Sequence, residues 1–153
     1  MKMTVKKESA ATTPSIKAVD IIGLVKSRYG IETSRRAMSD LIAGTLTVEG
    51  KVPRISLNEH LSEMYGRATM AIILDAVLQE GELTNVIVEF SDGNLPKLTE
   101  RARSLLMPEK LFRRAYEEKK SCGPLRPTLL AVTFQVPLAE VFNRIVELGL
   151  YGT

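Results

Sequence analysis

A serine followed by two arginines is the group of side chains in this sequence best suited to binding chemistry. Ser34, Arg35 and Arg36 come shortly after Gly30, at a point where a short helix is expected to begin. Arginine binds guanine edges or phosphate oxygens, and the free N–H groups of a helix N-terminus also favour phosphate. These residue types in this position predict contact with an anionic partner, above all duplex DNA.

The surrounding sequence predicts a pair of helices that would position these side chains. Ser15 is expected to cap a first helix over residues 16–29, and a second is expected over 35–43, ending at Gly44. Two helices joined by a short turn that contains glycine are typical of a helix-turn-helix. In that motif, the second helix places its N-terminal side chains in the major groove.

The pair departs from the usual helix-turn-helix pattern at three positions. Lys26 occupies a position where a small residue is expected, and Arg36 and Ser39 occupy apolar positions. A plain helical hairpin with solvated arginines is therefore the alternative interpretation.

A short β-hairpin is one interpretation of the next segment, residues 45–55. Leu46 and Val48 alternate with polar residues, and Glu49-Gly50-Lys51 suits a turn. Such a hairpin would carry Lys51 and Arg54, and it would contact the DNA backbone as a wing. An irregular connector is the alternative.

Two sets of residues are thus candidates for binding nucleic acid. The predicted interface consists of Lys26, Arg28, Ser34, Arg35, Arg36, Lys51 and Arg54, and a second basic patch consists of Arg113, Arg114, Lys119 and Lys120. In the second set, Arg113 and Arg114 each precede a glutamate, Glu117 or Glu118, by four residues. This spacing favours ion pairs within one solvated helix.

Three other residues with reactive side chains do not form a recognisable catalytic or metal-binding set. His60 is the only histidine and Cys122 the only cysteine, and they lie far apart in the chain. Asp75 lies within an apolar run, where a buried carboxylate would need a partner. We therefore predict no catalytic residues, no metal and no cofactor, and an enzyme is the function with least support.

The longest predicted helix runs over residues 57–80 and is the expected pillar of the core. Ser56 and Glu59 have the spacing of a capping box, and Gly81 is expected to end the helix. Strands are predicted over 85–90 and 128–136, and further helices over 96–107, 108–120 and 138–148. The predicted fold is α+β and mainly α-helical. It has a helix-turn-helix-like pair and hairpin at residues 15–55, packed on a core of the long helix, a small sheet and C-terminal helices at residues 56–153.

Composition and charge favour a cytoplasmic globular protein with an anionic or protein partner. Of the 153 residues, 44% are apolar and 25% charged, and the apolar runs are too short to span a membrane. Residues 1–14 are expected to form a mobile basic tail. The net charge is +5 over residues 1–36, −6 over 37–100 and +4 over 101–153. The basic ends would attract either nucleic acid or the acidic middle of the same chain or of a dimer partner.

Two hypotheses for function follow. The first is a small DNA-binding accessory or regulatory protein that contacts double-stranded DNA through the short helix bearing Arg35 and Arg36. The second is a protein-binding adaptor, chaperone or inhibitor without nucleic-acid contact. Either one is expected to work as a homodimer or with a protein partner.

Overall fold

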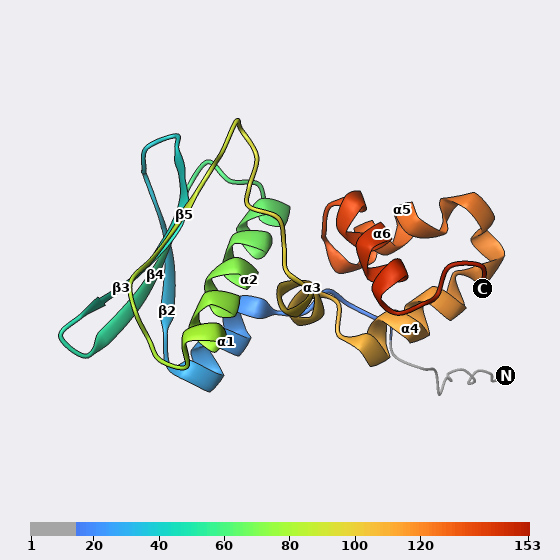
Figure 1. Ribbon diagram of the computed structural model, residues 1–153, viewed down its shortest axis with the longest axis horizontal. Helices are drawn as coiled ribbons and strands as arrows, with labels where there is room; N and C mark the ends of the chain where they lie inside the picture. Colours follow the sequence, from blue (N-terminus) through green and yellow to red (C-terminus); the bar gives the residue numbers. More distant parts are fainter. Residues whose placement is uncertain (1–14) are drawn as a thin grey trace, which may run out of the picture.

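The computed structural model describes residues 15–153, so the predicted tail over residues 1–14 lies outside the described residues. The chain folds into two lobes joined through α3 (Glu100–Leu106) (Figure 1). The first lobe contains α1 (Ile21–Tyr29), β2 (Glu32–Arg36), β3 (Ile42–Glu49), β4 (Val52–Asn58), α2 (Glu63–Glu80) and β5 (Val86–Glu89). The second contains α4 (Glu109–Glu118), the 3₁₀ segment η2 (Lys120–Leu125), α5 (Arg126–Phe134) and α6 (Leu138–Glu147). The predicted class, α+β and mainly helical, is confirmed.

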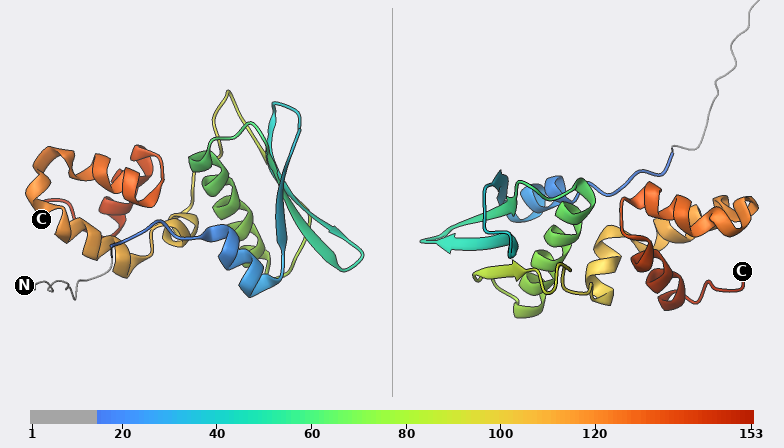
Figure 2. Two further views of the ribbon diagram at one scale, coloured as in Figure 1. Left: turned by 180° about the vertical axis from the view of Figure 1, so that it is seen from behind. Right: turned by 90° about the horizontal axis from the view of Figure 1, so that it is seen from above.

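A four-stranded mixed sheet forms one side of the first lobe, in the order β2-β4-β3-β5. β2 runs parallel to β4, whereas β3 pairs antiparallel with both β4 and β5. α1 and α2 cover one face of the sheet and leave the other face open, as the views from behind and from above show (Figure 2). The predicted hairpin is confirmed, because β3 and β4 are joined through a turn at Gly50 and Lys51.

The second helix predicted over residues 35–43 is wrong. Arg35 and Arg36 end β2, and Ile42 begins β3. The pattern of apolar positions in 35–43 fits a helix, but the parallel pairing of β2 with β4 overrides it, from Glu32 beside Arg54 to Arg36 beside Asn58. The helix-turn-helix-like head is therefore replaced by one helix and a strand, and the first helix begins at Ile21 rather than at 16.

The central helix α2 is shorter than the prediction for residues 57–80. Ser56 and Leu57 belong to β4, and the cap is Ser62, whose hydroxyl accepts a hydrogen bond from the Tyr65 N–H. The Ser56–Glu59 spacing resembles a capping box, but it is the end of a buried strand. The predicted end at Gly81 is confirmed, because Gly81 adopts the left-handed conformation at the C-cap.

α2 approaches the sheet closely at Gly44 of β3. A Cβ atom on Gly44 would lie 2.9 Å from the Thr69 methyl group of α2 and 3.0 Å from the Ser56 carbonyl oxygen. The sequence predicts that Gly44 ends a helix, but its role in the fold is to let helix and sheet pack without a side chain between them.

The strand predicted over residues 128–136 is also wrong, because these residues lie mainly in α5. A short apolar run with β-branched residues suits a buried strand or a buried helix equally, and the second lobe offers no strand to pair with. Phe134 of α5 packs against Phe112 of α4, with ring centroids 5.6 Å apart, at the centre of that lobe.

A charge network between α3 and α6 holds the second lobe against the helix that joins the two lobes. The guanidinium of Arg103 donates to Glu147 and, over 3.2 Å, to Glu140. Arg144 donates to Glu147 over 3.1 Å and to the Met107 carbonyl oxygen over 3.0 Å. Burial alone would lower the pKa of Arg103, but the hydrogen bonds and charges of the two glutamates raise its pKa. The network therefore contains a permanently charged arginine inside a nearly closed seam.

We predict that Gly44→Val destabilises the protein by about 1–3 kcal/mol, because the added methyl groups overpack the contact between α2 and β3. Urea unfolding followed by circular dichroism measures this loss. Thr47→Ala, at an exposed position on the same strand, should change stability by no more than about 0.5 kcal/mol. Equal midpoints for the two variants would show that Gly44 is not required for packing.

Arg103→Met should cost about 3 kcal/mol, because it leaves Glu147 and Glu140 without their shared cation in a mostly buried seam. The matched control is Arg114→Met, which removes a pair with Glu118 whose side chains are about half exposed, and which should cost less than about 0.5 kcal/mol. Thermal unfolding of both variants provides the comparison, and an Arg103→Met protein as stable as the wild type would contradict a structural role for the network.

Candidate functional site

Arg35, the central residue of the predicted DNA interface, is bound by the protein itself. It lies on the α2 side of β2, where its guanidinium donates to the Leu61 carbonyl oxygen over 3.0 Å and lies 3.7 Å from the Glu63 carboxylate. Its tip also fills the space above Gly66, where a Cβ would come within 2.7 Å of it. Arg35 thus fastens β2 to the start of α2.

Other predicted residues are brought together on the open face of the sheet. Ser34 and Arg36 alternate with Arg35 and so lie on the opposite face of β2, beside Ser56 and Asn58 of β4. Arg54 belongs to the same face, and Lys51 lies in the projecting hairpin turn.

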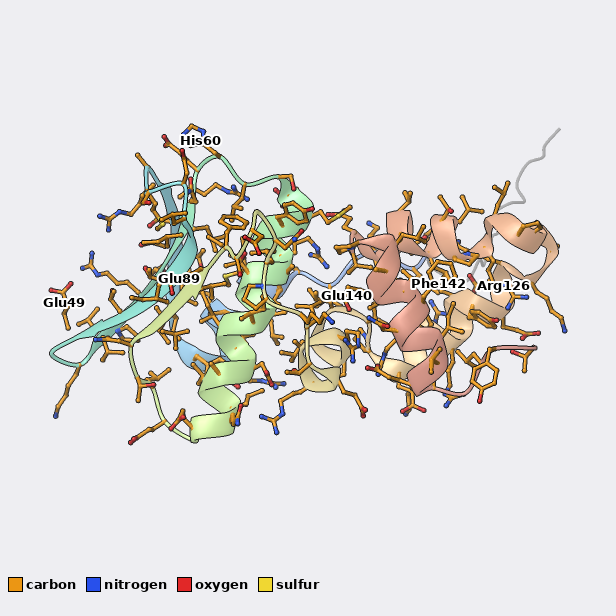
Figure 3. The ribbon with its side chains drawn as sticks, turned by 45° about the horizontal axis from the view of Figure 1, so that its top comes forward. Glu49, His60, Glu89, Arg126, Glu140 and Phe142 are labelled. Carbon is orange, nitrogen blue, oxygen red and sulfur yellow. The ribbon has the colours of Figure 1, made fainter. Side chains whose placement is uncertain are left out.

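The charge of this open face is mixed. Lys26 at the end of α1 lies 3.3 Å from the carboxylate of Glu32. Glu32 is the β2 residue that pairs with Arg54 of β4, so Lys26, one of the predicted DNA-binding residues, neutralises a carboxylate of this sheet. Glu49 at the hairpin tip and Glu89 on β5 add negative charge (Figure 3). Arg28 is exposed near the end of α1.

The second predicted patch consists largely of ion pairs within α4. Arg114 lies 3.6 Å from Glu118, as its spacing predicts. Arg113 instead bonds Glu109 over 2.8 Å, the residue four positions before it, and donates to the Leu148 carbonyl oxygen. Lys119 and Lys120 follow at the junction with η2.

The three residues with reactive side chains remain separate. His60 is exposed in the loop after β4 and lies 3.9 Å from Glu59 (Figure 3). Cys122 is half-buried in η2. Asp75 accepts a hydrogen bond of 2.9 Å from the Thr99 hydroxyl and lies 3.6 Å from Arg101, so it joins α2 to α3. Among residues 15–153, no three His, Cys, Asp or Glu side chains form a group that could hold a metal ion.

The most distinctive surface of the molecule is one that the sequence analysis did not identify. None of the exposed residues between positions 121 and 146 is charged. We call this the uncharged surface; its large apolar members, each 37–70% exposed, are Leu125, Leu129, Val132, Leu138, Phe142 and Val146. By contrast, every exposed residue of the neighbouring α4 is charged.

The charged residues of α5 and α6 are turned inward. Arg126 of α5 stacks on Tyr116 of α4, with its guanidinium carbon 3.9 Å from the ring centroid. The three charged residues of α6, Glu140, Arg144 and Glu147, all belong to the network with α3. In Figure 3, Glu140 lies between the two lobes, whereas Phe142 is on another side of α6.

α5 and α6 are joined by a turn of three residues, 135–137, and the segment Lys120–Phe134 meets Leu138–Glu147 at 107°. A short turn and a near-perpendicular crossing are typical of a helix-turn-helix. A DNA-reading helix, however, carries groups for bases and phosphates on its outer side, whereas the outer side of α6 has apolar side chains.

Within the described residues, no single helix is long and apolar enough to cross a membrane. The segments Lys120–Phe134 and Leu138–Glu147 reach the length and apolar character of a membrane span only when they are taken together, across the bend between them.

Comparison with known proteins gives one informative likeness, and it is to a solved structure. No family model matches the chain, and no curated protein matches it. A structure described as a Mycobacterium tuberculosis transcriptional regulator is similar in fold, with a TM-score of 0.51 and 16% sequence identity. The match covers 82% of this chain and 39% of the regulator. At this identity the likeness shows the fold alone.

Proposed function

We propose that this chain is a regulatory module that acts by binding another protein through the uncharged surface of α5 and α6. The observation that supports the proposal is the absence of exposed charge from position 121 to 146, in a chain in which 25% of all residues are charged. Protein interfaces have cores from which charged residues are depleted and in which aromatic residues are enriched. Phe142, half exposed on α6, is the aromatic residue placed to anchor such a contact.

The large apolar side chains that the fold leaves in water supply free energy for such a contact. Covering an exposed apolar side chain gains about 25 cal/mol for each Å² removed from water. Five such side chains on the two adjacent helices α5 and α6, with Leu125 of η2 just before them, therefore favour association, whereas scattered single ones would need no explanation.

The regulatory part of the proposal draws on the structural neighbour, which is described as a transcriptional regulator. This chain spans 39% of the length of that protein, so a module that serves a larger regulatory assembly fits the comparison. We extend the proposal to a cytoplasmic location and a non-enzymatic role.

A photo-cross-linking amino acid at position 132 or 142 tests the proposal in the cell. We expect a discrete protein adduct from both positions, because both side chains would lie in the interface. Position 41 is the matched control, since Leu41 is an equally exposed apolar residue, 67% against 70% for Val132, outside the surface. No adduct at 132 and 142, or the same adducts at 41, would refute the proposal.

A second candidate function, contact with duplex DNA, is favoured by the confirmed hairpin. Lys51 and Arg54 are exposed on or near its turn, and Arg36 on the same open face has no carboxylate among its contacts within residues 15–153. Strands and hairpins can bind DNA grooves or phosphates. This arrangement would replace the helix-based contact that the sequence predicts, and it would leave out Arg35.

Fluorescence anisotropy with a labelled duplex at several salt concentrations tests this second candidate. Arg36→Ala with Arg54→Ala should reduce the slope of log K against log salt by about 2, because each lost phosphate contact removes about one unit. Arg114→Ala, which removes a cation paired within α4, should leave the slope unchanged. A wild-type protein that does not bind the duplex at low salt would exclude this function.

A further inference from the structure

We infer that α6 pairs in antiparallel fashion with α6 of a second copy of this chain, along the stripe formed by Leu138, Phe142 and Val146. This inference rests on the proposed function, since it names the partner for part of the uncharged surface. The three side chains are 42%, 50% and 64% exposed, and their spacing of four residues aligns them on one side of the helix.

The stripe is self-complementary. A two-fold axis through Phe142 would place Phe142 against its symmetry mate, and Leu138 of each copy against Val146 of the other. Such an isologous contact uses the same patch twice, as most homodimers do. The stripe can pair with itself in this way, because Leu138 and Val146 at its two ends are both apolar and the residue at its centre, Phe142, would meet an identical side chain.

The charges of α6 also favour a second copy. Glu140, Arg144 and Glu147 are held in the network with α3, so like charges do not face each other across the axis. Ala139 and Asn143 flank the stripe and are small or neutral. In the antiparallel arrangement, the partial positive charge at the N-terminus of one helix lies beside the partial negative charge at the C-terminus of the other.

The stripe is accessible to a second copy, because its three side chains are 42–64% exposed. In the view from above, α6 lies at one edge of the second lobe, next to α3 (Figure 2). A helix of ten residues is about 15 Å long, so the contact is small. Interfaces that bury less than about 1,200 Å² belong to weak complexes, and we therefore expect a dimer that dissociates on dilution.

Disulfide trapping tests the register of the pair. The single native thiol is removed by Cys122→Ser, and Phe142→Cys, Leu138→Cys and Leu41→Cys are compared under a mild oxidant. We expect Phe142→Cys to form covalent dimers at least tenfold faster than the other two, because only this position meets itself across the axis. Equal rates for the three variants would mean random collision and would overturn the inference.

Light scattering over a range of concentrations tests the association itself. The wild type should shift towards twice the chain mass as the concentration rises, whereas Phe142→Glu should remain at the chain mass with an unchanged circular dichroism spectrum. A wild type that stays monomeric, or that pellets with phosphatidylcholine vesicles in place of dimerising, would overturn the inference.

The two proposals fail separately. If the wild type is monomeric and Phe142→Cys is not trapped, but photo-cross-linking at 132 and 142 still captures one other protein, the self-association is wrong and the protein-binding function stands. If the cross-links are absent as well, both are wrong. An adduct of twice the chain mass from position 142 supports both.

Discussion

The charge network between α3 and α6 is the interaction on which the arrangement of this molecule depends. Arg103 binds Glu140 and Glu147 in a seam where their side chains are 12–15% exposed, and Arg144 completes the set. Charges in such a place are stable only when they are paired and hydrogen-bonded. Meeting this requirement uses every charged residue of α6, and it fixes the second lobe against α3, the helix that joins the two lobes.

The same constraint determines the character of the outer surface. Because the charges of α6 face α3 and Arg126 of α5 stacks on Tyr116, the residues left outside are apolar or neutral. The interior seam and the proposed contact surface are thus two sides of one helix. The open face of the sheet, by contrast, carries cations and carboxylates together, and its central arginine, Arg35, is held by Leu61 and Glu63. This difference is the reason for placing protein contact ahead of DNA contact.

The sequence predicts much of the fold but little of the site. Elements with strong local signals, such as the hairpin at Gly50, β5 and α6, lie near their predicted positions. Residues 35–43 and 128–136 were assigned the wrong element because their pairing partners, β4 and the helices of the second lobe, lie outside any local window. The uncharged surface was missed for the same reason: residues 128–136 resembled a buried strand, and periodicity does not show which apolar residues a fold leaves exposed. The sequence does contain one signal for the uncharged surface: residues 121–146, a segment of 26 residues, include only three charged side chains.

Hydroxyl-radical footprinting of the purified chain across a range of concentrations tests most directly whether the outer side of α6 is a contact surface. The account predicts that oxidation of Phe142 slows as the concentration rises, while Leu41 and Tyr65, exposed apolar side chains on the other lobe, keep constant rates. Oxidation of Phe142 that stays constant, in step with those two side chains, would contradict it.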